Sequence, residues 1–410
     1  MAPFEIGLVL LGLVIGPFLN YAIYAFAYFP RPISPWQAIP TELAPRPNWR
    51  KLPILGWLGS GAECFHFGRV FWLRPLLIEI GTPCALLILY RYAMASTFMP
   101  VGSVPVGTAT LMVHFVAYGL LIGLMVIATF IDFDERTIPD WVTIPGTILG
   151  LVGGVLVPDW RLHEVSIPIF PAIVGQSMPL QANSPQNWNV AWNAIEGLQI
   201  GLICWTAWCF GMMDRRWISR RGWKKAFVYF AAVLRRSPST RPLALIWLVG
   251  MVLLCLAFAI LGVERWEALL SSLLGIGMGG LLVWGFRIVS GWAMNQEALG
   301  FGDVTLMAMI GSFFGWQIVW LAFFLAPFFG LIFVIIAWIV TRDSATPFGP
   351  YLCAATLYAM LDWVALWSWW SQWFQPVQWL LPFLLGLLIG LAAILWLTQS
   401  AKQFLLGQAR

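Results

Sequence analysis

The chain has 410 residues, of which 60% are hydrophobic and only 10% charged, and its formal net charge is +5 at pH 7. Soluble domains carry about 25% charged residues, so this composition excludes an ordinary soluble protein and predicts a polytopic membrane protein. No long basic run occurs outside one loop, so we expect no nucleic acid partner. The six cysteines form no CxxC pair, and we therefore expect no metal site, disulfide framework or cofactor.

Apolar runs of about 20 residues predict membrane-spanning helices. The first run lacks a basic segment before it, which favours a retained span over a signal peptide. We expect an all-α protein, and we expect residues 1–410 to form one membrane-embedded domain. The run 304–341 is too long for one helix, and Gly315-Trp316 predicts a turn within it. Eleven spans result: 4–27, 76–96, 108–131, 141–157, 193–213, 242–262, 267–290, 304–316, 317–341, 350–369 and 377–398.

The distribution of Lys and Arg predicts the orientation of these spans. Segment 28–75 holds six basic residues and segment 214–241 holds nine, whereas 158–192 holds only Arg161. With the basic segments in the cytoplasm, the N-terminus lies outside and the C-terminus inside. Segment 158–192 is then predicted to be an irregular loop outside, interrupted by prolines.

Two acidic residues at the edges of apolar segments are the leading candidates for chemistry. Asp132 ends the third predicted span and Asp303 begins the eighth, so the orientation places both at the cytoplasmic face. Acidic residues in membrane segments are costly and mark functional sites. Two carboxyl groups sharing a proton can activate water and protonate a leaving amine. From the helix dipoles we expect Asp303 to start as the base and Asp132 as the acid.

Glycines and further acidic residues surround the candidate pair in the sequence. Gly300 and Gly302 flank Asp303 and would allow a second chain to approach closely. Asp134 and Glu297 are weaker candidates. Asp134 could be solvated or polarise its neighbours, and Glu297 could be a solvated loop acid or read substrate charge. Glu79 is an acid inside the second span, for which Arg74 is a possible partner. The turn at 345–350, which contains Pro347 and Gly349, falls on the same predicted face.

Five stretches of the sequence resemble motifs of the type IV prepilin peptidases. They are GPFLNYAIY (16–24), RPLLIE (74–79), FIDFDERTIPD (130–140), EALGFGDVTLMAMIGSFFGW (297–316) and TPFGPYL (346–352). The resemblance implies an aspartic endopeptidase of the inner (plasma) membrane that cuts the basic leader of a prepilin or pseudopilin after a glycine. It maps the catalytic pair of that family onto Asp132 and Asp303. It also implies contact with membrane lipids and lateral entry of the substrate helix.

The sequence departs from that family in the segment after the first span. Many members carry two CxxC pairs there that bind zinc and are linked to N-methylation of the new pilin N-terminus, whereas this segment holds only Cys64. The resemblance therefore does not extend to the methyltransferase activity. Two other classes stay open from the residues alone. One is a proton- or cation-coupled transporter that uses the same carboxylates, and the other is a catalytically inactive homologue that assembles a secretion machine.

Overall fold

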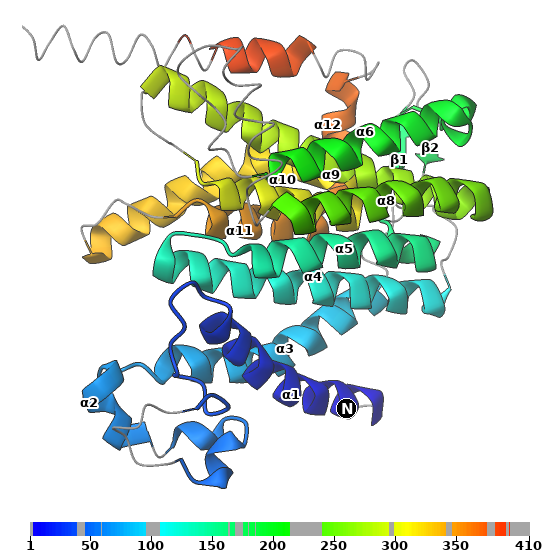
Figure 1. Cartoon of the computed structure of the whole chain (residues 1–410). Coiled ribbons are helices and arrows are strands. Elements are labelled where there is room, and N and C mark those ends of the chain that lie inside the picture. Colours follow the sequence, from blue (N-terminus) through cyan, green and yellow to red (C-terminus); the bar gives the residue numbers. More distant parts are fainter. Residues whose placement is uncertain are drawn as a thin grey trace, which may run out of the picture.

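Long apolar helices form the body of the structure, which is a computed structural model (Figure 1). It describes residues 3–38, 46–58, 60–95, 107–162, 165–168, 175–178, 180–184, 186–213, 240–294, 299–341, 347–374, 382–390 and 393. The principal elements are α1 (Pro3–Ala25), α2 (Cys64–Phe67), α3 (Leu73–Met94), α4 (Thr108–Glu135), α5 (Asp140–Leu156), β1 (Val165–Pro168), β2 (Gly175–Met178), α6 (Ile195–Gly211), α8 (Thr240–Ile260), α9 (Val263–Met294), α10 (Phe301–Thr341), α11 (Gly349–Leu361) and α12 (Trp363–Ser371).

The predicted all-α class is confirmed, with one small addition. Strands β1 and β2 pair antiparallel, with Val165 opposite Met178 and Pro168 opposite Gly175. They lie within segment 158–192, which the sequence analysis predicts to be irregular. Two strands of four residues are too short to form a layer of their own. The hairpin therefore caps one end of the helices without changing the architecture.

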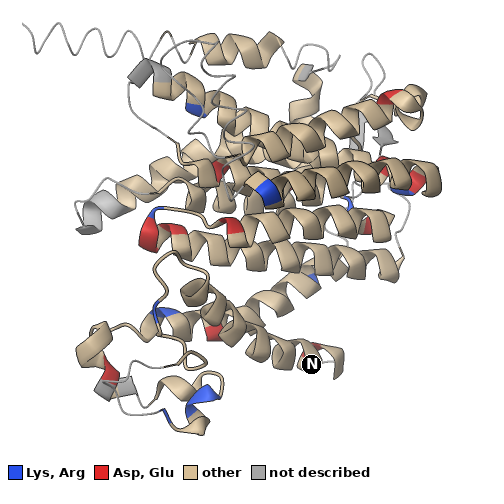
Figure 2. Cartoon of the chain, in the orientation of Figure 1, with Lys and Arg blue, Asp and Glu red and all other residues tan. Residues whose placement is uncertain are grey.

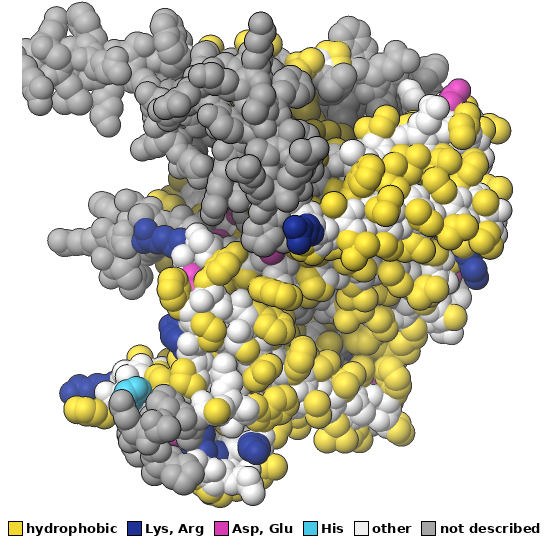
Figure 3. Space-filling model, in the orientation of Figure 1, with side chains coloured by type: hydrophobic (Ala, Val, Ile, Leu, Met, Phe, Trp, Pro, Cys, Tyr) yellow, Lys and Arg dark blue, Asp and Glu magenta, His cyan; other side chains and the backbone are white. Residues whose placement is uncertain are grey.

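Six helices in the described residues are long and apolar enough to cross a membrane, or seven if the bent pair α11–α12 counts as one span. The expected eleven spans are therefore not confirmed. Two of the predicted runs lie together in α10, and α5 and α6 have only 17 residues each. Charged residues lie mainly towards the helix ends (Figure 2), and apolar side chains cover the helix faces visible in Figure 3. These features are those of a multi-pass membrane protein, in which the orientation of the termini stays a prediction.

Glycine pairs allow α9 and α10 to approach each other closely. A Cβ atom added at Gly279 would clash with the backbone of Met307, and Gly275 and Gly311 would clash with each other in the same way. Small residues at a helix interface permit this close backbone contact, which replaces the missing hydrophobic driving force between helices in a membrane. The first arm of α10 is thereby fixed against α9.

Helix α10 reverses its direction at the position predicted for a turn. Gly315 has φ 81° and ψ −179°, a conformation that glycine adopts without strain. Before it, Gly311 packs on Gly275, and after it, Phe323 contacts Phe286 with ring centroids 4.7 Å apart. Before Gly315, α10 runs towards the N-terminus of α9, from Gly279 to Gly275. Phe286 lies towards the C-terminus of α9, so after Gly315 the chain runs back along α9. The second arm of α10 is therefore antiparallel to the first. The second arm therefore returns to the end of the molecule where α10 began.

Candidate functional site

Asp132 lies in the last turn of α4 and is only 4% exposed. The helix ends at Arg136, which takes the left-handed conformation (φ 56°) and donates its backbone N–H to the carbonyl oxygen of Asp132 at 2.8 Å. A residue in this conformation is a common helix terminator. The carboxyl group of Asp132 is consequently held at a defined helix end, inside the protein.

Asp303 lies in the first turn of α10 and is 6% exposed. Its Oδ2 accepts the backbone N–H of Gly300 at 3.1 Å. This contact satisfies one of the free N–H groups at a helix start, as the acidic member of a capping box does. Capping alone would account for an acid at this position. Burial close to a second carboxyl group is what distinguishes Asp303 from an ordinary capping residue.

The structure brings the two aspartates together around Ile138. A Cβ atom added at Gly302 would lie 2.8 Å from the Cβ of Ile138, and one at Gly349 would lie 2.8 Å from its Cδ1 and 2.5 Å from Asp132 Oδ2. The carboxyl groups of Asp132 and Asp303 are also close enough to interact electrostatically. These glycines therefore allow close packing within the protein, whereas the approach of a second chain at Gly302 stays a prediction.

The described part of the predicted turn, residues 347–350, also borders the site. Pro347 and Phe348 precede α11, and the backbone N–H of Gly349 donates to Asp132 Oδ2 at 3.1 Å. Cys353, one turn further along α11, is buried and lies near both aspartates. Asp132 thus faces the N-terminus of α11, just as Asp303 sits at the N-terminus of α10. The dipole of α10 favours negative charge on Asp303. Asp132 lies between the C-terminus of α4, which disfavours negative charge, and the N-terminus of α11, which favours it, so the assignment of acid and base stays a prediction.

The predicted pairing of Glu79 with Arg74 is wrong. Glu79 is 2% exposed and accepts the amide of Asn20 at 3.1 Å and the backbone N–H of Ile54 at 2.6 Å. Asn20 lies on α1, so a buried acid in one helix has found a polar partner in its neighbour. Arg74 instead pairs with Asp134, at 2.7 Å and 2.8 Å.

Asp134 stands apart from the two buried aspartates. Asp134 forms ion pairs with Arg31 and Arg74 and is not simply solvated. Glu297 lies outside the described residues. No hydrogen bond or ion pair joins Asp134 to Asp132 or Asp303 in the described structure. The role of substrate-charge reader suggested for Glu297 stays a prediction.

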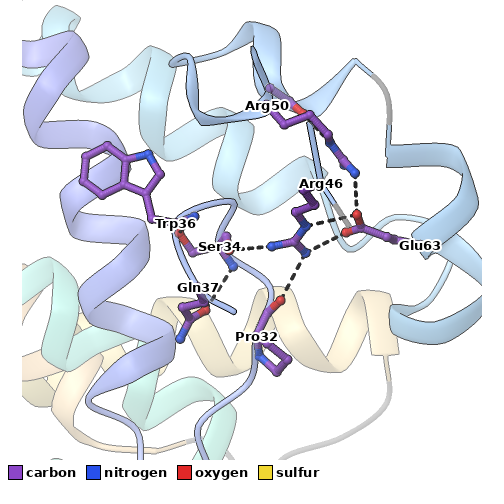
Figure 4. A network of polar contacts seen from close by, with 8 residues as sticks. Pro32, Ser34, Trp36, Gln37, Arg46, Arg50 and Glu63 are labelled. Atoms are coloured by element: carbon purple, nitrogen blue, oxygen red, sulfur yellow. Dashed lines mark hydrogen bonds and ion pairs between the residues drawn. The ribbon is translucent and has the colours of Figure 1, made fainter. Parts of the chain in front are cut away.

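A buried ionic cluster in segment 28–75 escaped the sequence analysis (Figure 4). Glu63 accepts hydrogen bonds from Arg46 at 2.7 Å and 3.0 Å and also pairs with Arg50. Arg46 donates in addition to the carbonyl oxygens of Ser34 and Pro32, at 2.6 Å and 3.1 Å. No spacing in the sequence predicts this arrangement. The cluster joins three stretches of a segment that has little secondary structure of its own.

Neither a metal site nor a ligand cavity adds to the aspartate pair in the described residues. They contain no group of three or more His, Cys, Asp or Glu side chains placed to hold a metal ion. An apolar cavity of about 170 Å³ lies between α6, α9 and α10, and Phe301, Val304, Thr305 and Ala308 form its α10 wall. At 100° per residue these positions lie on the face of α10 opposite Asp303. The cavity is therefore separate from the carboxyl groups.

A family model matches more than half of the chain. The model of the type IV leader peptidase family covers residues 119–214 and 202–335. This region includes both buried aspartates and the helices between them. No solved structure gives a significant match.

Individual relatives match shorter stretches. A prepilin leader peptidase/N-methyltransferase of Pseudomonas aeruginosa is 37% identical over 98 residues, which is 23% of this chain and 32% of the relative. The enzyme of the same name from Stutzerimonas stutzeri is 31% identical over 136 residues, 32% of this chain and 41% of the relative. Leader peptidase HopD of Escherichia coli is 31% identical over 93 residues, 22% of this chain and 57% of the relative. The chain thus spans about a third to a little over half of the length of these curated relatives.

Proposed function

The chain belongs to the type IV leader peptidase family, and we propose that it is an aspartic endopeptidase that removes the leader of prepilins or pseudopilins. The observation that carries this proposal is the meeting of two buried carboxyl groups, Asp132 and Asp303, at helix ends. Relatives named as prepilin leader peptidases support the choice of substrate. Membership of the family also supports residence in the inner membrane.

The proposed reaction is hydrolysis of one peptide bond by the aspartate pair. One ionised carboxylate takes a proton from a water molecule while the water oxygen attacks the scissile carbonyl carbon. The other carboxyl group, protonated, donates its proton to the carbonyl oxygen. Collapse of the intermediate breaks the C–N bond, and a proton passes to the leaving amine. Because the two groups interact, the apparent pKa values belong to the pair, and we expect a bell-shaped dependence of rate on pH.

The position of the pair fits a substrate that enters from the membrane. Asp132 and Asp303 lie at the ends of long apolar helices, where the apolar segment of a pilin could lie in the bilayer with its leader at the surface. Gly349 keeps a side chain out of the space beside Asp132. Lipid contact would then be a condition of substrate entry. The proposal includes no metal and no methyl transfer.

The proposed function is favoured over the other two classes. Transporters commonly bind substrate near the membrane midplane, between related halves, whereas both aspartates lie at helix ends. An inactive assembly homologue would not need both carboxyl groups buried together. No feature of the described residues favours either alternative.

Purified full-length protein in proteoliposomes, mixed with a purified pseudopilin, tests the proposal. The substrate carries a basic leader, a glycine at the junction and an apolar helix, and leader removal is followed by mass spectrometry. A matched substrate carries Val in place of the junction glycine. We expect the first substrate to lose its leader at the junction and the second to stay intact. Intact mass for several pseudopilins of the first kind would contradict the proposal.

A further inference from the structure

Asp134 is held by two guanidinium groups from different parts of the chain. Its Oδ1 and Oδ2 accept Nη1 and Nη2 of Arg74 at 2.7 Å and 2.8 Å, and Arg31 also pairs with Oδ2. The side chain of Asp134 is only 17% exposed. Bidentate Arg–carboxylate pairs are strong and fix the relative orientation of both groups. Asp134 therefore links the end of α4 to α3 and to the segment that follows α1.

Arg74 is itself locked in place by its surroundings. Its Nη2 donates to the hydroxyl of Tyr24 at 2.9 Å. The rings of Tyr24 and Phe130 both lie 5.3 Å from its guanidinium carbon. Such cation–π contacts hold a guanidinium in one place. The partner of Asp134 is consequently a rigid group that joins α1, α3 and α4.

Glu135, the last residue of α4, strengthens the same junction. Its two carboxylate oxygens accept the backbone N–H groups of Tyr28 and Phe29, at 2.8 Å and 2.9 Å. The segment after α1 is therefore bound to α4 through both Asp134 and Glu135. We call the set Arg31, Arg74, Asp134 and Glu135 the α4 clamp.

Asp132 and Asp134 lie on opposite faces of the last turn of α4. Residues two positions apart in a helix differ by about 200° in direction, so Asp132 faces Gly349 of α11 while Asp134 faces Arg74 of α3. Resting on the proposed peptidase function, we propose that Asp134 is a positioning residue that fixes Asp132 for catalysis. It then does not bind the basic leader, because a leader Lys or Arg would first have to displace Arg74.

Kinetics with two substrates separate positioning from leader binding. The substrates are the pseudopilin with a leader rich in Lys and the same protein with those Lys replaced by Gln. The variants are Asp134→Asn, Arg74→Gln, Arg74→Lys and the milder Arg31→Gln, in full-length protein in proteoliposomes. Arg91→Gln is the matched control, because Arg91 also lies on α3 and pairs with an acid on α1, Glu5, at 2.9 Å near the other end of both helices.

Positioning predicts a loss of kcat with little change in KM. Misplacing a catalytic group by about 1 Å costs about 100-fold in rate, so we expect kcat to fall about 10- to 100-fold in Asp134→Asn and Arg74→Gln, equally for both leaders. Arg74→Lys should retain part of the rate, Arg31→Gln should lose less than Asp134→Asn, and Arg91→Gln should match the wild type.

Provided that the wild type cleaves the substrates, either of two results would overturn the inference. One is a wild-type kcat in Asp134→Asn. The other is a rise in KM for the Lys-rich leader alone, which would make Asp134 a leader-binding residue. If Asp134→Asn fails to fold, Arg31→Gln and Arg74→Lys decide between these outcomes by their kcat and KM values. A wild type that cleaves neither substrate contradicts the proposed function instead.

Discussion

The backbone N–H of Gly349 donates a hydrogen bond of 3.1 Å to Asp132 Oδ2, joining two residues 217 positions apart in the chain. This contact places the start of α11 directly on one of the two buried carboxyl groups. It also explains why the turn before α11 belongs to the site although it carries no acid or base. The turn supplies a backbone donor and, through the missing side chain of Gly349, the space for Asp132.

Replacing Gly349 with Ala tests whether that space matters. The new Cβ would lie 2.5 Å from Asp132 Oδ2 and 2.8 Å from Ile138 Cδ1, so the carboxyl group must move. We expect Gly349→Ala to lower kcat by at least about tenfold, measured as leader removal per unit time. Gly123→Ala is the control, because its Cβ would meet only Leu19 at 3.8 Å. Equal rates in the two variants would refute this role.

Glu79 is predicted to support the fold rather than the chemistry. Truncation in Glu79→Ala would leave the N–H of Ile54 without its acceptor. It would also remove one of the two acceptors of the buried Asn20 amide, which keeps the carbonyl oxygen of Pro75. An unsatisfied buried donor costs about 1–3 kcal/mol, so the free energy of unfolding in detergent should fall by about that amount. Glu79→Gln, which keeps one acceptor oxygen, should lose less. The exposed Glu196 on α6 provides the control, and a Glu79→Ala variant as stable as Glu196→Ala would contradict the prediction.

The cluster around Glu63 should make segment 28–75 sensitive to acid. Burial acts to raise the pKa of Glu63, but the hydrogen bonds and charges of Arg46 and Arg50 outweigh it and hold the pKa below its ordinary value of 4.5. A pKa that is lower in the folded state contributes stability that is present above the ordinary value and lost as pH falls through the folded value.

Limited proteolysis of this segment at pH values from 7 downwards measures the effect. We expect the wild type to become much more susceptible to protease only as the pH falls below the ordinary Glu pKa of 4.5. Glu63→Gln should be susceptible already at pH 7 and change little on acidification, because its two arginines have lost their counter-charge. The same pH profile in both proteins would show that Glu63 does not control this segment.

The sequence predicts the central pair of residues because an ionised group in an apolar segment is rare and costly. The spacing of spans places Asp132 and Asp303 at one face, and Gly315 marks the reversal within α10. The partner of Glu79 could also have been found, because Asn20 is a polar residue in the adjacent apolar span and buried polar groups need each other.

Other features depend on contacts that no local pattern encodes. Arg74 lies five residues before Glu79 on α3, about 140° away around the helix, so the two side chains do not share a face. The bidentate partner of Arg74 is Asp134 of α4. The pairing of Glu63 with Arg46 and Arg50 involves two short 3-10 helices, Asn48–Lys51 and Ser60–Glu63. They are too short for a 3.6-residue or a 2-residue period to be recognised. The sequence analysis predicted α5 and α6 as membrane spans because both are apolar. Composition alone does not fix the length of a helix, and each has only 17 residues.

The central claim is that Asp132 and Asp303 together hydrolyse the leader junction. The most direct measurement is the mass of a pseudopilin after incubation with the wild type, Asp132→Asn, Asp303→Asn and Asp159→Asn in proteoliposomes. Asp159 is the control, because it binds Thr110 at the opposite end of α4 at 2.9 Å. The account predicts leader loss with the wild type and Asp159→Asn and an intact mass with the other two at equal protein levels. Cleavage at the wild-type rate by either Asp132→Asn or Asp303→Asn would contradict it.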